Sequence, residues 1–559
     1  MIVSGPWLPL AALATPLMLG LLAAIPAVRP RALLLLPLAP LPGLTWAVSG
    51  PTGQLTEVHP LLLGARLGLD GAGALFLGVA ALVWALAGLF AVAYLRRTPQ
   101  RAPFVSFWCL TLAGNLGVFA ARDAATFYVS FAAVSLPAYV LVVHEATAAA
   151  QRAGRIYLVL AVLGETCLIA GLIIACAQAD ALGIAEVREA LAAAPQRDGA
   201  VALMLIGFGI KAGLVPLHVW LPLAHPEAPT PASAVLSGAI VKAGLFGMLR
   251  FMPQGTGMEE WSLLLVALGL IGAYYGVVLG LSQGNPKATL AYSTVSQMGL
   301  MIAAVGAATR AEAPAAAAVV IALYAAHHGA AKGALFLSVG VAGRSTPRER
   351  PLVLAVAALV ALSVAGLPLT GGAVVKTALK GELHGLAKTL FSASAAGTAL
   401  MLLHFWRLLR REPPSSQTRA GLSLFGPFLA AASAALALPW FLLPAAELEA
   451  ASMVTEANLW SAGWPLILAA ALFGGARALR MSALRLPAGD LVVLAERLAP
   501  SARPRCFRAP AGARRRPSIP FVVGRIGRIE RILRRWSAAG TLLVAAAVLL
   551  AASLLVKVE

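Results

Sequence analysis

The sequence predicts an all-α, polytopic membrane protein with about 14–16 transmembrane helices. Of its 559 residues, 60% are hydrophobic and only 12% are charged, whereas soluble domains contain about 25% charged residues. Mean hydropathy is +0.85. Apolar runs of about 20 residues, the length needed to cross a hydrocarbon core of ~30 Å, recur along the whole chain.

Sixteen apolar stretches qualify as spans. The first has no basic segment before it, so we expect a retained span and not a cleaved signal peptide. The stretches are 6–28, 31–49, 71–95, 103–121, 124–143, 155–178, 199–222, 229–252, 261–281, 288–307, 314–342, 351–385 (interrupted), 388–410, 421–445, 457–479 and 538–556.

The loops between these spans alternate in charge. Basic loops contain 96-RRTPQR-101, 151-QRAGR-155, 344-RSTPRER-350 and 407-RLLRRE-412. Because Lys and Arg collect in cytoplasmic loops, the net charge of +20 indicates membrane topology and not nucleic-acid binding. We therefore expect a bacterial inner-membrane protein with both termini outside the cytoplasm. The intervening loops carry the acidic residues Glu57, Asp180, Glu186, Glu189, Glu259, Glu260, Glu312, Glu447 and Glu449.

An arginine-rich segment precedes the last span. Residues 477–536 contain fifteen arginines and three acidic residues. Its end, 525-RIGRIERILRRW-536, places isoleucines, Leu533 and Trp536 on one helical face and arginines on the other, which predicts an interfacial amphipathic helix. A basic surface anchor is the preferred interpretation, and a docking strut against neighbouring subunits is the alternative.

Four ionisable residues, Lys211, Lys242, Lys332 and Glu165, lie near the centres of their spans. A charge at this depth is costly and usually marks an ion path. A lysine reaches the interface only from near a helix end, so snorkelling is the weaker explanation. A buried lysine can exchange its proton near neutral pH, and the sequence therefore predicts a proton relay. For Glu165, a protonated carboxyl satisfied by hydrogen bonds is the alternative.

Two of the spans are expected to be broken. Lys376 ends 366-GLPLTGGAVVK-376, whose proline and glycines interrupt a helix at membrane depth, and Lys211 is followed by Pro216 and Pro222. Broken helices are tolerated only where they line a cavity or are buried in protein. Paired interruptions in two halves of a chain indicate the transport site of an inverted-repeat transporter. Two unrelated proline kinks are the alternative.

Histidines accompany the lysines. His327 and His328 lie on the helix of Lys332, and His328 is one turn before it on the same face, which predicts a relay. His218 and His225 flank the first break. For each histidine, a packing role is the alternative.

No redox-cofactor or metal motif is present in the sequence. There is no CxxC spacing, no GxGxxG in a strand–helix context and no phosphate loop. We therefore expect no cofactor and no metal in this chain, and a role as a subunit and not as an oxidoreductase by itself. Its cysteines are Cys109, Cys167, Cys176 and Cys506.

The stretch 216-PLHVWLPLAHPEAPTPASAVLSGAIVKAG-244 resembles the signature of the proton-conducting antiporter-like membrane subunits. That family includes chains L, M and N of respiratory complex I, the large subunits of Mrp antiporters, and component B of hydrogenase-4 and formate hydrogenlyase. Three further stretches match in order: 287-KATLAYSTVSQMG-299, 328-HGAAKGALFL-337 and 366-GLPLTGGAVVK-376. The stretch 216–244 looks more similar to hydrogenase-4 component B and complex I chain M than to chain L.

The resemblance implies two inverted five-helix repeats, each with a broken helix, and a row of lysines that carries protons. By motif, Lys211 matches the lysine of the first broken helix and Lys242 that of the next span. Lys332 matches the connecting lysine, and Lys376 the exit-side residue of the second broken helix. Lys287, which opens the second motif, is a secondary candidate.

The resemblance, the span pattern and the arginine-rich segment together divide the chain into five parts. They are N-terminal transmembrane helices (1–100), the antiporter-like core (101–410), additional transmembrane helices (411–480), a basic cytoplasmic or interfacial amphipathic segment (481–537) and a C-terminal transmembrane helix (538–559).

Two positions depart from the family pattern. The glutamate that the family usually pairs with the first lysine corresponds to Ala132, and Glu165, one span later, is a candidate substitute. The aspartate usually found two residues before Lys287 is Asn285. Both departures point to a divergent member, with altered ion coupling or a scaffolding role.

The preferred function is a proton-translocating subunit of a complex I-like or group 4 hydrogenase-like assembly, with soluble redox subunits as partners. The alternatives are an Mrp-type cation/proton antiporter subunit and a membrane partner that energises inorganic carbon uptake. All three place the chain in a lipid bilayer beside other membrane subunits, and none involves nucleic acid.

Overall fold

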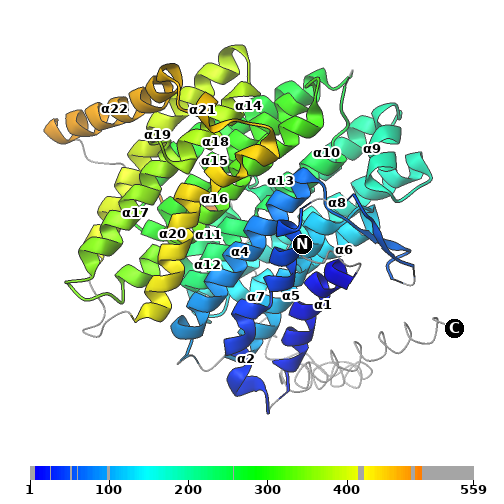
Figure 1. The fold of residues 1–559 in the computed structure, drawn as a ribbon, viewed down its shortest axis with the longest axis horizontal. Helices are drawn as coiled ribbons and strands as arrows, with labels where there is room; N and C mark the ends of the chain where they lie inside the picture. Colours follow the sequence, from blue (N-terminus) through cyan, green and yellow to red (C-terminus); the bar gives the residue numbers. More distant parts are fainter. Residues whose placement is uncertain are drawn as a thin grey trace, which may run out of the picture.

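The computed structural model describes residues 7–25, 27–50, 53–59, 61–96, 98, 101–255, 257–412, 421–479 and 485–493. This part of the chain forms one bundle of helices that run side by side, with one short β-hairpin (Figure 1). Twelve of its helices are long and apolar enough to cross a membrane. The predicted fold class, an all-α polytopic membrane protein, is confirmed.

Fifteen of the sixteen predicted spans fall within these ranges, and each corresponds to one helix or to a helix pair. The sixteenth, 538–556, and the amphipathic helix predicted at 525–536 lie outside the described residues. The helices are α1 (Trp7–Leu22), α2 (Arg29–Leu35), α3 (Leu41–Val48), α4 (Gly71–Tyr94), α5 (Arg101–Ala120), α6 (Ala124–Ser135), α7 (Ala138–Val142), α8 (Ala148–Ala179), α10 (Arg197–Ala212), α11 (Trp220–Glu227), α12 (Thr230–Val235), α13 (Lys242–Phe251), α14 (Glu259–Leu281), α15 (Pro286–Ala308), α16 (Pro314–Ala342), α17 (Arg350–Ala365), α18 (Gly371–Gly381), α19 (Gly385–Arg411), α20 (Leu422–Leu442) and α22 (Glu456–Ala478).

The alternating loop charge corresponds to the two ends of the bundle. At one end, which we call the acidic face, neighbouring loops are joined by backbone hydrogen bonds. The Ile184 N–H donates to Arg122 O at 3.0 Å, and the Gly255 N–H donates to Thr309 O at 2.9 Å. At the other end, the basic face, the Arg350 guanidinium donates to Leu409 O at 3.0 Å. The hydrogen bonds thus group the loops as the charge pattern does.

The sequence did not predict two small elements of the acidic face. Strands β1 (Thr56–Val58) and β2 (Ala65–Leu67) pair antiparallel, and both lie at the same end of the bundle as α9 (Ile184–Ala192) (Figure 1). Strands of three residues are too short to show an alternating pattern. They form here because neighbouring chain segments extend the sheet, through a bridge between Leu67 and Ala121.

Each broken span ends its first helix with the same glycine cap. Helix α10 stops at Gly213, which has φ of 77°, and the Leu214 N–H donates to Gly209 O at 2.8 Å. Helix α17 stops at Gly366, which has φ of 103°, with the Leu367 N–H donating back five residues at 2.9 Å. Left-handed φ values favour glycine, and this bond pattern is a Schellman cap. The glycines therefore end the helices, before the prolines are reached.

The two broken spans belong to two sets of five spans. The first set is α5, α6–α7, α8, α10–α11 and α12–α13, and it starts at the basic face. The second set is α14, α15, α16, α17–α18 and α19, and it starts at the acidic face. The sets therefore run in opposite senses through the membrane, as expected for inverted repeats.

Helix α16 is the structural centre of the bundle. It packs against helices of both sets (α12, α15, α17 and α18) and against α4 and α20 outside them. From Val320 to Ser338 every residue of α16 is buried. A helix that is surrounded on all sides can hold polar side chains only where neighbouring helices supply partners.

Asp70 ties three segments together at the acidic face. Its Oδ1 accepts the Gly73 N–H at 2.8 Å, which caps α4. Arg250 donates to both carboxylate oxygens, and Arg122 donates to Oδ2 at 3.1 Å. Burial by itself raises the pKa of Asp70, but the hydrogen bond and charge of Arg250, with the charge of Arg122, hold that pKa below its ordinary value.

We expect Asp70→Asn to lower the thermal unfolding midpoint of the protein in detergent. Asparagine keeps the helix cap but removes the charge, and losing one partner of a partly exposed ion-pair cluster costs about 1–3 kcal/mol. Because the pKa of Asp70 is lowered in the folded state, its stabilisation is present above about pH 4, the ordinary carboxyl pKa, and is lost as pH falls further. The gap between wild type and Asp70→Asn should therefore shrink as pH falls below about 4. A gap that does not change with pH would contradict the ion-pair account.

Candidate functional site

Lys211 lies in the last turn of α10, at the first break, against aromatic rings. Its Nζ is 5.6 Å from the ring centroid of Phe131 on α6 and 5.7 Å from that of Tyr157 on α8. Trp220, at the start of α11, packs edge-on against Tyr157 and donates its indole N–H to Ile210 O at 2.7 Å. Aromatic faces stabilise a cation where water is excluded. The enclosure therefore suits a lysine that carries a proton part of the time.

Glu165 is the acidic neighbour of Lys211. It is buried on α8, which packs along α10, and the two groups are close enough to interact electrostatically. They are not in direct ion-pair contact, and Glu165 Oε2 has no hydrogen-bond partner among the residues that the structure describes. Ala132 follows Phe131, whose ring faces Lys211. The acidic neighbour of Lys211 thus comes from α8 and not from α6, where the family pattern would place it.

Lys242 starts α13, directly after a π-helical turn, Leu236–Ile240. Its Nζ donates to Ser237 O at 2.5 Å and lies 2.8 Å from Nδ1 of His328 on α16. Both side chains are only 1% exposed. Because π-helical turns break the regular backbone pattern and often mark functional sites, the Ser237 carbonyl is available to the ammonium group.

Two glycines allow Lys242 and His328 to meet. Gly238 in the π-helical turn and Gly329 on α16 face each other, and a Cβ on Gly329 would lie 2.7 Å from Gly238 O. Glycine pairs let helix backbones approach closely in membranes. The hydrogen bond between the lysine and the histidine therefore depends on the absence of a side chain at these positions.

Gly329→Ala should lower both the unfolding midpoint of the protein and the proton flux predicted for the lysine row. The added methyl group meets backbone, so α16 must shift, and overpacking of this kind costs about 1–3 kcal/mol. The matched control is Gly333→Ala, one turn along α16, where a Cβ meets only Val83 methyl groups at 3.7 and 3.8 Å. Equal behaviour of the two variants would refute the close-approach argument.

Lys332 lies one turn beyond His328 on α16, and its Nζ donates to Leu290 O on α15 at 2.9 Å. The direct hydrogen bond of His328 is to Lys242 across the helix interface and not to Lys332 on its own helix. His328 and Lys332 thus each bond to a different neighbouring helix. The structure brings all three groups into one region.

His327 faces the opposite half of the molecule. Its Nε2 lies 3.1 Å from Ser363 Oγ on α17, which also accepts the Gly372 N–H of α18 at 3.2 Å. Adjacent residues on an α-helix point about 100° apart. His327 therefore connects α16 with α17 of the second set of spans. His328 connects α16 with α13 of the first set.

Lys376 is held at the second break. Its Nζ donates to Ala365 O, the last residue of α17, at 3.0 Å, and its stem packs against Gly366. The final carbonyls of a helix lack intrahelical partners. The lysine thus uses an acceptor that only a broken helix exposes.

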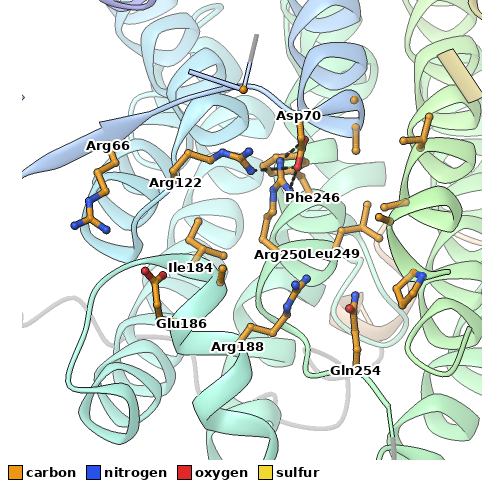
Figure 2. Close-up of a pocket in the computed structure, with 18 of the residues that line it drawn as sticks. Arg66, Asp70, Arg122, Ile184, Glu186, Arg188, Phe246, Leu249, Arg250 and Gln254 are labelled. Atoms are coloured by element: carbon orange, nitrogen blue, oxygen red, sulfur yellow. Dashed lines mark hydrogen bonds and ion pairs between the residues drawn. The ribbon is translucent and has the colours of Figure 1, made fainter. Parts of the chain in front are cut away.

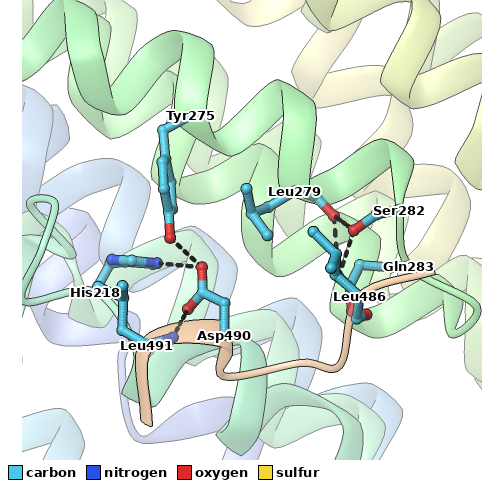
Figure 3. Close-up of polar contacts among 8 residues, drawn as sticks. All are labelled: His218, Tyr275, Leu279, Ser282, Gln283, Leu486, Asp490 and Leu491. Carbon is cyan, nitrogen blue, oxygen red and sulfur yellow. Dashed lines mark hydrogen bonds and ion pairs between the residues drawn. The ribbon is translucent and has the colours of Figure 1, made fainter. Parts of the chain in front are cut away.

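A carboxylate that sequence reasoning did not identify reaches the first break. Asp490 lies in the segment 485–493, accepts a hydrogen bond from the Tyr275 hydroxyl and lies 3.7 Å from His218 Nε2 (Figure 3). His218 is fully buried. The available signal was that Asp490 is one of only three acids in the arginine-rich segment, but no sequence pattern could bring it to a residue 272 positions earlier.

Two secondary candidates make no described hydrogen bond to the lysines of the row. His225 is fully buried, stacks on Phe336 with ring centroids 4.5 Å apart, and has no hydrogen-bond partner for either ring nitrogen in the described part of the chain. Lys287 is near the basic face, where its Nζ donates to Ala228 O at 2.8 Å. Asn285 keeps one role of the usual aspartate, since its Oδ1 caps α15 by accepting the Lys287 N–H at 2.8 Å.

These contacts form two clusters and a central helix. The first cluster contains Lys211 and Glu165, and the second contains Lys376 at the other break. Between them, α16 carries His328 bonded to Lys242 and His327 bonded to Ser363. His328 Nε2 is buried without a partner among the described residues. An imidazole that is bonded at one nitrogen and unpaired at the other can accept a proton on one side and release it on the other.

Comparison with known proteins agrees with this architecture. Residues 121–401, half of the chain, match the family described as NADH:quinone oxidoreductase/Mrp antiporter, TM. The chain is 35% identical over 334 residues to an uncharacterized protein of Mycobacterium tuberculosis (strain ATCC 25618 / H37Rv), covering 56% of this chain and 51% of that protein.

Relatives with named functions show the same partial coverage. Hydrogenase-4 component B of Escherichia coli (strain K12) is 33% identical over 249 residues, covering 43% of this chain and 37% of that protein. An NAD(P)H-quinone oxidoreductase chain 4 of Thermosynechococcus vestitus is 34% identical over 270 residues, covering 45% and 49%, respectively. The aligned region thus spans about half the length of these relatives, or less.

The fold is also found in a solved structure. A chain of the Mrp complex from Dietzia sp. DQ12-45-1b superposes with a TM-score of 0.71 at 24% identity, covering 98% of this chain and 63% of that chain. The fold, the ordered motifs and the family match agree. This chain is a multi-pass membrane protein that belongs to the NADH:quinone oxidoreductase/Mrp antiporter transmembrane family.

Proposed function

We propose that this chain moves protons across a bacterial inner membrane, as one subunit of a complex I-like or group 4 hydrogenase-like assembly. The observation that carries the proposal is the buried pair of Lys242 and His328, 2.8 Å apart between two broken helices. Two cations at this distance repel each other. The pair therefore holds one excess proton more readily than two, and a second proton that arrives from Lys211 would drive the first onward.

The proposed route runs across the membrane plane as well as through it. Lys211, with Glu165, receives protons at the first break, and Lys242, His328 and Lys332 pass them through the centre. Lys376 releases them at the second break. His218 lies beside Asp490, and the segment of Asp490 contacts Gln283 in the loop between α14 and α15. That loop is at the basic face, which the distribution of arginines assigns to the cytoplasm. The pair of His218 and Asp490 would supply the entrance for protons from the cytoplasm. With the basic face in the cytoplasm, both termini would lie outside it.

Partners follow from the same proposal. The chain has no redox motif, so the driving reaction would come from soluble redox subunits, next to further membrane subunits. The similarity to hydrogenase-4 component B and to a quinone oxidoreductase chain 4 supports this choice. Exchange of sodium for protons, and the energising of inorganic carbon uptake, are the competing functions.

The test is purification of the tagged chain from its native host in mild detergent, followed by mass spectrometry and reconstitution into vesicles. We expect co-purifying iron–sulfur or nickel–iron subunits and substrate-driven acidification or alkalinisation of the vesicle lumen. Small membrane subunits alone, with sodium-dependent proton movement, would replace this proposal by cation exchange. A large zinc protein as the main partner would replace it by carbon uptake.

A further inference from the structure

A cavity at the acidic face is separate from the lysine row. It has a volume of about 630 Å³ and lies where α9, the end of α13 and the starts of α4 and α16 meet (Figure 2). A volume of this size is typical of small-molecule sites. The charged side chains that line it are Arg66, Arg122, Arg188, Arg250, Asp70 and Glu186.

Positive charge exceeds negative charge within this cavity. Arg122 and Arg250 share one carboxylate, that of Asp70, which leaves the three groups with one excess positive charge. Nε of Arg250 is buried without a partner among the described residues. The Glu186 carboxylate folds back against Gly183, where the N-terminus of α9 stabilises an anion.

Arg188 adds another cation to this cavity. Its guanidinium points from α9 towards Arg250 (Figure 2), and it makes no hydrogen bond or ion pair with any residue in the described ranges. Burial and the charge of Arg250 lower the pKa of Arg188, and the charges of Asp70 and Glu189 offset this only in part. A guanidinium held towards another guanidinium is unfavourable unless an anion lies between them.

Apart from Gln254, the side chains of the remaining wall of the cavity are apolar. It is formed by Phe246 and Leu249 of α13 and by Ala315, Ala318 and Val319 of α16. Arginines on one side and hydrocarbon on the other match a molecule that has an anionic head and an apolar remainder. Guanidinium groups bind phosphate oxygens in a bidentate manner.

We propose that this cavity binds a phosphate-bearing anion, whose phosphate group lies between Arg188 and the Arg122–Arg250 pair. Two sources share this chemistry: the headgroup of an anionic phospholipid, and free phosphate from the medium. The apolar wall favours the phospholipid. The inference does not depend on proton transport, because none of these residues belongs to the lysine row.

The experiment measures the unfolding midpoint of the purified full chain in detergent while one anion is titrated at constant ionic strength. One arm adds phosphatidylglycerol in mixed micelles, with phosphatidylcholine as the neutral comparison, and the other adds inorganic phosphate against chloride. We expect the midpoint to rise with phosphatidylglycerol. A response to phosphatidylglycerol alone identifies a lipid site, and a response to inorganic phosphate identifies a free-phosphate site.

The decisive variant is Arg188→Gln, since Arg188 makes no hydrogen bond or ion pair with a described residue and its loss should not disturb folding. The half-saturating anion concentration should rise by at least about tenfold, the effect of losing a charged hydrogen bond. The matched control is Arg310→Gln, which removes an exposed arginine of the same face that lies 3.9 Å from Glu259. Equal responses of both variants, or equal responses to both lipids without any response to phosphate, would overturn the proposal.

Discussion

Lys242→Ala should abolish proton movement through this chain while leaving the protein folded in the membrane. The substitution removes both the hydrogen bond to Ser237 O and the contact with His328. Because α13 stays packed by its other buried residues, we expect normal assembly. Loss of one proton-transfer group reduces rates by about a hundredfold or more, and the flux is measured in reconstituted vesicles with a pH-sensitive dye.

Two further variants show why the flux is lost. Lys242→Arg keeps the positive charge, but arginine does not release its proton in proteins, so it should fail as completely as alanine. Full flux in Lys242→Arg would mean that the position needs only a charge. Lys388→Ala removes an exposed lysine at the start of α19 and should leave the flux unchanged, which controls for the loss of a lysine as such.

Gly372→Ala should have the largest effect on folding stability. A Cβ at Gly372 would lie 1.6 Å from Ser363 O and 2.5 Å from Ser363 C, and backbone atoms cannot rotate away. Helix α18 would have to move, which would disrupt the hydrogen bonds that join Gly372 and His327 to Ser363. Overpacking of this kind costs about 3 kcal/mol, so both the unfolding midpoint and the flux should fall.

The control for this prediction is Gly381→Ala at the other end of α18. A Cβ at Gly381 would have open space around it, and alanine favours a helix over glycine by up to about 1 kcal/mol. Gly381→Ala should therefore be at least as stable as the wild type. If Gly372→Ala also matched wild type in both measurements, the contact between α17 and α18 would be looser than described.

Much of the fold could be predicted because membrane crossing is decided locally. A span needs about twenty apolar residues, and a loop is assigned to one side by its own arginines. The first break was predicted from Pro216 and Pro222, and the interruption is there. The end of helix α10, however, is set by Gly213, because its left-handed cap stops the helix before either proline. The β-hairpin was missed because its strands form only beside the neighbouring chain.

The candidate site could be predicted in composition but not in pairing. Lysines at the centres of spans are rare, so the sequence alone marks them as candidate site residues. The sequence spacing suggested that His328 pairs with Lys332, but the observed hydrogen-bond partner is Lys242, 86 positions away. Asp490 was not predicted at all, because its approach to His218 depends on how the segment after α22 returns to the bundle.

The sequence by itself determined that this protein spans the membrane, which loops are predominantly basic, where two spans break and which lysines are buried. Each of these properties follows from a short stretch of residues and its cost of transfer into hydrocarbon. Only the tertiary structure decided which groups exchange hydrogen bonds, because those partners come from different helices. Their distances are set by the Gly238–Gly329 and Ser363–Gly372 contacts, where the lack of a side chain lets two backbones meet.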